Sequence, residues 1–212
     1  MKIAVSFLSS KYSFEETINK INESNADLIH VDIMDGIFVE KNNFSKKKIK
    51  YLLKNSTKNL DIHLMVKNPK KYLNIFKNSL VDIIYFHPKS EKSPLKFINK
   101  VKHYHKKVGI AIDSDEDIKT YEKYFSLVDY ILLMSVKAGA GGQKFLLSTN
   151  EKIKNLIEIK EINNYEFKIS LDGGVNGETI KNIEYKSNID YVVSGSFICH
   201  SDDFKKNINM LK

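Results

Sequence analysis

Two histidines and two aspartates are the residues of this chain whose types and spacing could do chemistry. His30 and Asp32 alternate within one apolar run, His63 lies within a second run, and Asp172 ends a third. Imidazole nitrogens and carboxylate oxygens together make a donor set for a divalent cation. Taken singly, a buried histidine is more often a hydrogen-bonded core residue, and an aspartate at a strand end often caps the next helix. Charged residues are rare in buried strands, so four of them in corresponding places favour a metal site.

Three glycine-containing segments predict a second role for the same region. Each follows one of the late apolar runs: Gly139-Ala140-Gly141-Gly142-Gln143, Gly173-Gly174 and Gly195-Ser196. Glycine lets a ligand approach free backbone N–H groups closely, and phosphate sites of α/β barrels favour the last strands. Glycine also serves ordinary turns, so the placement of all three segments together is what indicates a phosphate group.

The elements that must position these residues are short apolar runs, nearly continuous in hydrophobicity, as in strands covered by helices on both faces. Side chains two residues apart on a strand point to the same face. We therefore expect one face, at the carboxyl ends of the strands, to carry the metal candidates together with Ser6, Met34, Met65 and Met134. The runs are residues 3–7, 28–33, 60–65, 82–86, 108–112, 130–136, 167–171 and 191–194.

Lysine- and glutamate-rich amphipathic stretches separate the runs and predict about eight helices. Residues 14–21 fit the first helix, residues 150–157 the sixth and residues 204–211 the last. For the third helix, around residues 72–76, Pro69 fits the first turn and Asn68 can act as its cap. Strict alternation predicts an α/β fold, either a closed (β/α)8 TIM barrel or an open doubly wound sheet. With no linker or change of composition, residues 1–212 are expected to form a single domain.

Composition and charge exclude several classes. The net charge is +8, yet the sequence contains no arginine, the residue that makes bidentate contacts to guanine and phosphate. We therefore expect no nucleic-acid partner, and the lysine surplus can instead attract an anionic substrate. No apolar run reaches the length of a membrane span and the N-terminus lacks a signal-peptide pattern, so no membrane partner and a cytoplasmic location are expected. The one cysteine, Cys199, cannot form an internal disulfide.

Several motifs, in order and along the whole chain, resemble the ribulose-phosphate 3-epimerase family of the pentose phosphate pathway. The second-strand and seventh-strand motifs are the specific ones, and the glycine pieces alone are not. The matching segments are residues 6–9 (SFLS), 30–39 (HVDIMDGIFV), 61–66 (DIHLMV), 134–136 (MSV), 141–145 (GGQKF), 172–176 (DGGVN) and 195–196 (GS).

This resemblance implies a (β/α)8 barrel that binds one divalent metal ion per chain, commonly zinc, iron, manganese or cobalt. The positions that match the family's ligands are His30, Asp32, His63 and Asp172, and the two aspartates also match its acid–base pair. The implied reaction interconverts D-ribulose 5-phosphate and D-xylulose 5-phosphate through an enediolate. The resemblance also implies a homo-oligomer. Substrate-contacting positions are matched by Ser6, Met34, Met65, Met134, Gly139, Gly141, Gly142, Gln143, Gly173, Gly174, Gly195 and Ser196.

The chain also departs from the family pattern. Lys137-Ala138-Gly139-Ala140 stands where the family usually has Asn-Pro-Gly-Phe, which is expected to loosen a loop over the substrate. Lys89 replaces a usual glutamate, Asp113-Ser114-Asp115 replaces a proline-containing loop, and Val39-Glu40-Lys41 replaces Val-Pro-Asn. An epimerase of another ketose phosphate, such as allulose 6-phosphate, and a non-catalytic phosphate-binding barrel are the alternatives. A barrel decarboxylase is less well matched, because Asp35 and Lys67 do not reproduce its acid and lysine pattern.

Overall fold

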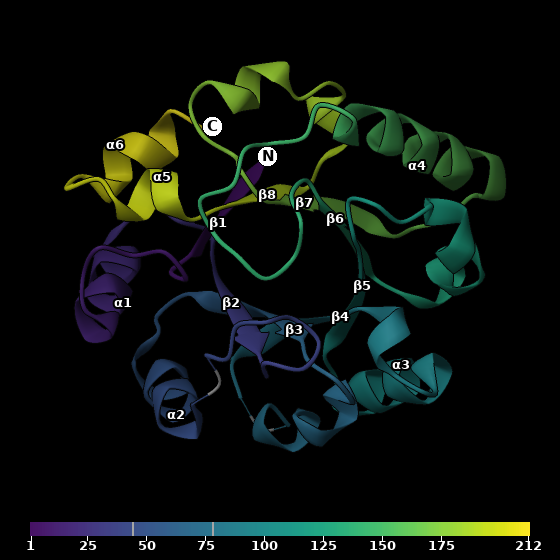
Figure 1. The fold of residues 1–212 in the computed structure, drawn as a ribbon, viewed down its shortest axis with the longest axis horizontal. Helices are drawn as coiled ribbons and strands as arrows, with labels where there is room; N and C mark the ends of the chain where they lie inside the picture. Colours follow the sequence, from purple (N-terminus) through teal and green to yellow (C-terminus); the bar gives the residue numbers. More distant parts are fainter. Residues whose placement is uncertain (44, 78) are drawn as a thin grey trace.

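A computed structural model describes residues 1–43, 45–77 and 79–212. Within these residues, eight parallel strands follow one another in sequence order, and the first pairs with the last, so the sheet closes into a barrel (Figure 1). The strands are β1 (Lys2–Ser6), β2 (Leu28–Met34), β3 (Asn59–Met65), β4 (Val81–Phe86), β5 (Lys107–Ile112), β6 (Tyr130–Met134), β7 (Lys168–Asp172) and β8 (Tyr191–Ser194). The expected TIM barrel is confirmed, and the open sheet is excluded.

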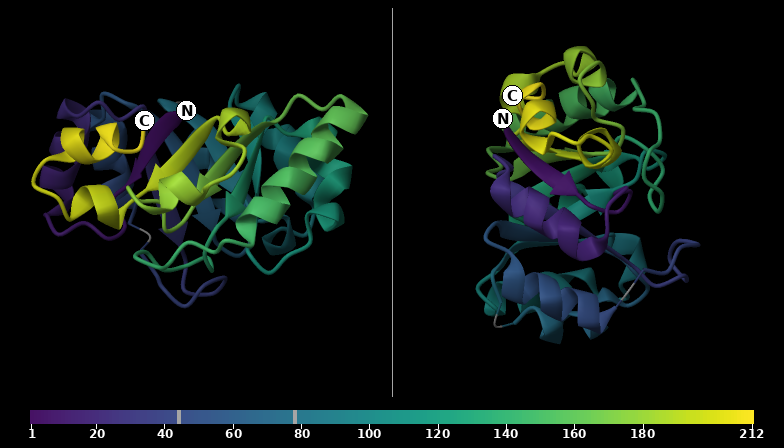
Figure 2. Two further views of the ribbon diagram at one scale, coloured as in Figure 1. Left: turned by 90° about the horizontal axis from the view of Figure 1, so that it is seen from above. Right: turned by 90° about the vertical axis from the view of Figure 1, so that its left-hand side faces the viewer.

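Helices surround the barrel and shield the outer faces of its strands (Figures 1 and 2). In the described part of the chain, the α-helices are α1 (Phe14–Glu23), α2 (Lys46–Asn55), α3 (Pro94–His103), α4 (Thr149–Asn163), α5 (Ser196–Cys199) and α6 (Phe204–Asn209). Short 3-10 segments complete the ring: η1 (Pro69–Lys71), η2 (Leu73–Ile75), η3 (Pro88–Ser90), η4 (Ile118–Leu127), η5 (Thr179–Asn182) and η6 (Lys186–Asn188).

The first helix shows why amphipathic stretches take these positions. Ser13 caps α1 by accepting a hydrogen bond from the backbone N–H of Glu16, and Ile18 and Ile21 are fully buried against the barrel. Side chains from both strand faces separate into two cores. The larger lies between strands and helices, and the smaller comprises Ala4, Leu28, Ile83, Tyr85, Ala111, Tyr130, Leu132, Met134, Tyr191 and Val193.

The third predicted helix is wrong in type. Residues 69–76 form the two 3-10 turns η1 and η2 instead of an α-helix. Pro69 does stand in the first turn, but Asn68 is left-handed, with φ 57°, and its side chain makes no capping hydrogen bond. A left-handed residue directs the chain away from the extended entry that an N-cap requires, and the segment is too short for a full amphipathic helix.

Strand register brings the predicted site residues to one level of the barrel. Asp32 on β2 pairs with His63 on β3, and Met34 pairs with Met65. On the other side of the barrel, Met134 on β6 pairs with Asp172 on β7. All of these positions lie in the carboxyl-terminal halves of their strands, where barrel enzymes build their sites. No helix in the described residues is long and apolar enough to cross a membrane.

Candidate active site

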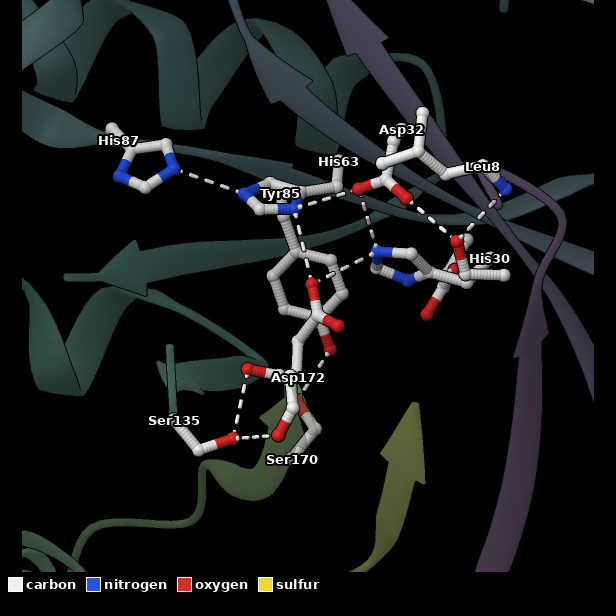
Figure 3. A network of polar contacts seen from close by, with 12 residues as sticks. Leu8, His30, Asp32, His63, Tyr85, His87, Ser135, Ser170 and Asp172 are labelled. Atoms are coloured by element: carbon white, nitrogen blue, oxygen red, sulfur yellow. Dashed lines mark hydrogen bonds and ion pairs between the residues drawn. The ribbon is translucent and has the colours of Figure 1, made fainter. Parts of the chain in front are cut away.

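His30, Asp32, His63 and Asp172 converge in the mouth of the barrel (Figure 3). The Nε2 atom of His30 lies 3.3 Å from Oδ1 of Asp32 and 3.5 Å from Oδ2 of Asp172. The Nδ1 atom of His63 lies 3.4 Å and 3.6 Å from the same two oxygens. Each carboxylate oxygen therefore lies between two ring nitrogens, as the alternation of residues along β2 and β3 predicts.

These separations fit a divalent ion. A tetrahedral site with metal–ligand bonds of about 2.0–2.2 Å has ligand–ligand edges of about 3.3–3.6 Å. The inward nitrogens, Nε2 of His30 and Nδ1 of His63, are buried without a hydrogen-bond partner among the described residues. Buried polar atoms normally have a partner, so these two nitrogens point to a ligand between them. The group could hold a metal ion, and its mixed nitrogen and oxygen donors do not select one metal.

Electrostatics also favour a cation at this point. Burial lowers the pKa of His30, but the carboxylates of Asp61, Asp32 and Asp172 outweigh burial and raise that pKa well above its ordinary value. Burial raises the pKa of Asp32, but His30 and His63 outweigh it and bring the net pKa below its ordinary value. The pKa of Asp172 is lowered in the same way, chiefly by His30. The site therefore favours ionised carboxylates with positive charge between them, which is the field that a divalent ion needs.

The outward nitrogen of His30 faces a buried polar network. Nδ1 of His30 lies 2.7 Å from Oδ1 of Asp61, a residue with no exposed surface. The hydroxyl of Tyr191 donates to Oδ2 of Asp61 at 2.5 Å and lies 2.7 Å from the hydroxyl of Tyr85, which is 3.1 Å from Ser170 Oγ. A carboxylate behind a histidine fixes its orientation and leaves the other nitrogen free for a metal.

The outward nitrogen of His63 has a different partner. Its Nε2 lies 2.9 Å from Nε2 of His87, which follows β4 and is fully buried. The two rings stack, with centroids 5.1 Å apart (Figure 3). Neither Asp61 nor His87 was predicted as a site residue. Asp61 could have been found, because it lies two residues before His63 on the same strand and so faces the same side.

A pocket above the metal candidates is lined by every residue predicted to contact substrate. Met34, Met65 and Met134 are almost fully buried at its base. Ser6 lies beside them, and its hydroxyl donates to Oδ2 of Asp32 at 2.8 Å. The pocket wall also contains Leu8, Ser9, Val136 and Lys137, which were not predicted as site residues. The other predicted residues that line it are Gly139, Gly141, Gly142, Gln143, Gly173, Gly174, Gly195 and Ser196.

The glycines after β7 are required by space and by backbone conformation. Gly173 has φ +119° and Gly174 has φ +66°, a region that favours glycine. A Cβ at Gly173 would overlap the side chain of Val136, and one at Gly174 would overlap the backbone of Phe145. The loop after β6 therefore packs directly on the loop after β7.

Gln143 has a structural task inside the loop after β6. Its side-chain amide donates to the carbonyl oxygens of Lys137 and Ala140, at 2.6 and 2.7 Å. Gly139 packs closely against Val39 of the loop after β2. A Cβ at residue 139 would lie only 2.9 Å from Val39 Cβ, so the contact leaves no room for a side chain. The segment that departs from the family pattern is therefore fastened at both ends.

A closed (β/α)8 barrel with two imidazoles and two carboxylates beside a glycine-lined pocket has the layout of a barrel enzyme with a candidate metal site. The chain matches the model of the Ribulose-phosphate 3 epimerase family over residues 2–199. The protein therefore belongs to this isomerase family.

Curated relatives agree along the full length. The ribulose-phosphate 3-epimerase of Methanocaldococcus jannaschii is 33% identical over 213 residues, covering 100% of this chain and 90% of that protein. The ribulose-phosphate 3-epimerase of Bacillus subtilis is 30% identical over 214 residues, covering 100% of this chain and 98% of that protein.

Among solved structures, the chain is similar to 3-hexulose-6-phosphate synthase from Salmonella typhimurium, with a TM-score of 0.70 and 15% identity over 100% of this chain and 96% of that one. It is also similar to phosphoribosyl anthranilate isomerase from Thermococcus kodakaraensis, with a TM-score of 0.59 and 17% identity over 99% and 96%. At these identities the likeness shows the fold alone.

Proposed function

We propose that this protein interconverts D-ribulose 5-phosphate and D-xylulose 5-phosphate by inverting C3. The observation that carries the proposal is the convergence of Asp32 and Asp172 on the same pair of imidazoles from β2 and β7. Inversion next to a carbonyl needs one base on each face of the carbon, and two carboxylates from different strands can supply them.

In the proposed reaction, the carboxylate on one face of the sugar removes the C3 proton, and the second returns a proton to the other face. The intermediate is an enediolate of the sugar. His30, Asp32, His63 and Asp172 would hold a divalent ion, which supplies Lewis-acid stabilisation of negative charge. The imidazoles orient that ion and the aspartates, and Ser6 holds Asp32 by its hydrogen bond.

The pocket supports the substrate class. Met34, Met65 and Met134 would cover the planar intermediate with an apolar, polarisable surface that excludes water. Within the described residues, the backbone N–H groups of Gly142 and Gly174 have no acceptor, so they are available to phosphate oxygens. Gly139, Gly141, Gly173, Gly195 and Ser196 would complete the phosphate end of the pocket, while Gln143 would shape it through the loop.

We also propose that residues 1–212 form a single domain. The pairing of β1 with β8, which joins the first strand of the barrel to the last, supports this. A homo-oligomer and a cytoplasmic location rest on the family resemblance and on the sequence, respectively.

The test compares Asp172→Asn and Asp32→Asn in an assay of xylulose 5-phosphate formation. Asparagine keeps the size and one oxygen donor but cannot accept the C3 proton, so each variant is expected to lose at least about 100-fold in kcat. Exchange of the C3 proton with deuterated water separates the two roles, because the carboxylate that remains can still exchange the epimer that it faces. Wild-type turnover in either variant would overturn the two-aspartate mechanism. Faster turnover of allulose 6-phosphate than of ribulose 5-phosphate would overturn the substrate.

A further inference from the structure

Behind His63 lies a second charged group, at the carboxyl ends of β4 and β5. It contains His87, Lys89, Asp113 and Glu116, three of which could together hold a cation. The ammonium of Lys89 lies 2.5 Å from Oδ2 of Asp113 and 3.2 Å from Oε1 of Glu116. The group therefore has its own cation, supplied by the chain.

His87 joins this group to the candidate metal site. Its ring is stacked between that of His63, 5.1 Å away, and that of Phe38, 4.8 Å away, and it has no exposed surface. One ring nitrogen, Nε2, contacts His63, and the other, Nδ1, faces Oδ2 of Asp113 at 3.6 Å. His87 therefore lies between Asp113 and His63, with one ring nitrogen facing each of them.

The donor and acceptor roles of the ring nitrogens determine where the protons lie on His63 and His87. For Nδ1 of His63 to bind a metal, its ring proton must be on Nε2, which then donates to His87. His87 must accept through Nε2 and so carries its own proton on Nδ1, toward Asp113.

The loop after β5 is built to hold Asp113 in place. The backbone N–H of Asp113 donates to Glu116 Oε2, and Lys152 donates to the carbonyl oxygens of both residues. The hydroxyl of Tyr121 donates to Oε1 of Glu116. Lys89 and Asp113 stand at two of the positions where this chain departs from the family pattern, and they contact each other. The two departures therefore form one unit.

We propose that Asp113 and Lys89 are positioning residues that act as a pair through His87, holding His63 in the tautomer and orientation that bind the metal ion. The inference rests on the metal site of the proposed function. Burial raises the pKa of Asp113, Lys89 opposes that rise, and its ammonium holds the carboxylate beside His87. It also takes the place that a second divalent ion would need between Asp113 and Glu116.

The experiment measures the affinity of the metal-free protein for Zn²⁺ and Co²⁺ by competition with a chromophoric chelator. His87→Phe preserves the ring stack but removes both nitrogens, and is expected to weaken binding about 10- to 100-fold, as is usual for loss of a partner behind a metal ligand. Asp113→Asn and Lys89→Met act one step further away, and each is expected to weaken binding about 3- to 10-fold. Because the two residues form one unit, the double variant should lose no more than the larger single loss.

A matched control lies at the opposite ends of the same two strands. Lys107 on β5 and Asp82 on β4 form an ion pair at 3.0 Å, and Asp82→Asn breaks it without approaching the site. This variant should keep wild-type metal affinity, and Lys89→Arg, which retains the cation, should stay close to wild type. Unfolding temperatures of the metal-free variants separate positioning from folding.

Unchanged metal affinity in Asp113→Asn and Lys89→Met, with a lower unfolding temperature, would overturn the inference and leave the pair only a structural role. If the fold losses of metal affinity in the two single variants multiply in the double variant, Lys89 and Asp113 do not act as a pair. Absence of metal binding by the wild-type protein would overturn this inference together with the metal site. Absence of epimerase activity of the wild-type protein against every ketose phosphate, with the metal affinities changed as expected, would instead overturn the proposed function and leave this inference standing.

Discussion

Asp61 offers a quantitative test of how the barrel interior prepares the metal site. It has no exposed surface, and its two oxygens are both engaged: Oδ1 lies 2.7 Å from Nδ1 of His30, and Oδ2 accepts the hydroxyl of Tyr191. Asp61→Asn keeps the shape and one acceptor for His30, but it removes the negative charge and places an amide donor where Tyr191 donates now. The carboxylate behind His30 would therefore be lost without a cavity.

The expected cost follows from these contacts. Partners behind metal-binding histidines usually contribute about 10- to 100-fold to metal affinity, which is about 1.4–2.7 kcal/mol. Asp61→Asn should fall in the upper half of this range, because the lost group is a fully buried charge in direct contact. Tyr191→Phe leaves the charge and removes one hydrogen bond to it, so a loss of about 3- to 10-fold is expected, in line with about 1 kcal/mol for one hydrogen bond.

The assay is competition for Zn²⁺ against a chromophoric chelator, with circular dichroism to confirm that each variant is folded. Asp190→Asn serves as a control, because Asp190 Oδ2 accepts a backbone hydrogen bond from Ile169, and within the described residues its carboxylate is bonded to neither His30 nor Asp61. Wild-type metal affinity in a folded Asp61→Asn protein would refute the reasoning. So would a larger loss in Tyr191→Phe than in Asp61→Asn.

Three further predictions test the loops, the cysteine and the metal. Gly142→Ala and Gly174→Ala are a matched pair: both have positive φ, but a Cβ meets nothing within 4 Å at residue 142 and overlaps the Phe145 backbone at residue 174. Chemical denaturation should show a loss of about 1 kcal/mol for the first and about 1–3 kcal/mol more for the second, and equal losses would contradict this. Burial raises the pKa of Cys199 to about 12, so a thiol reagent at pH 8 should label it only in denaturant, and rapid labelling of native protein would refute its burial. Chelation should abolish epimerase activity and one equivalent of a divalent ion should restore it, whereas turnover by protein shown to be metal-free would exclude the metal's role.

Much of the site could be predicted because strand geometry is regular. Alternation along β2 places His30 and Asp32 on the face that His63 shares on β3, and register then brings Asp32 level with His63 and His30 level with Asp61. The predicted residues on strands, Ser6, Met34, Met65 and Met134, line one pocket. The predicted glycines, Gln143 and Ser196 reach it because their segments follow the carboxyl ends of β6, β7 and β8. Closure of the barrel could not be obtained from alternation alone, because an open sheet satisfies the same pattern, and only the family resemblance selected between them.

What the sequence did not predict depends on side-chain contacts between distant elements. Gln143 was predicted to contact substrate and lines the pocket, but the sequence did not indicate that its amide nitrogen donates to the carbonyl oxygens of Lys137 and Ala140. These two hydrogen bonds hold the loop that lacks the family's proline and phenylalanine. Similarly, the contact between His87 and Asp113 joins the ends of β4 and β5, and no local pattern in either strand indicates it.

The two aspartates are chemically unequal although they share the same imidazoles. Ser6 donates a hydrogen bond to Oδ2 of Asp32, and such a bond stabilises the ionised carboxylate. Burial raises the pKa of Asp172 and His30 lowers it, while the negative charge of Asp32 raises it again. The two carboxylates therefore have different hydrogen-bond surroundings. The proposed inversion needs one group to take a proton while the other holds one ready, and two carboxylates in different surroundings fit this division of roles.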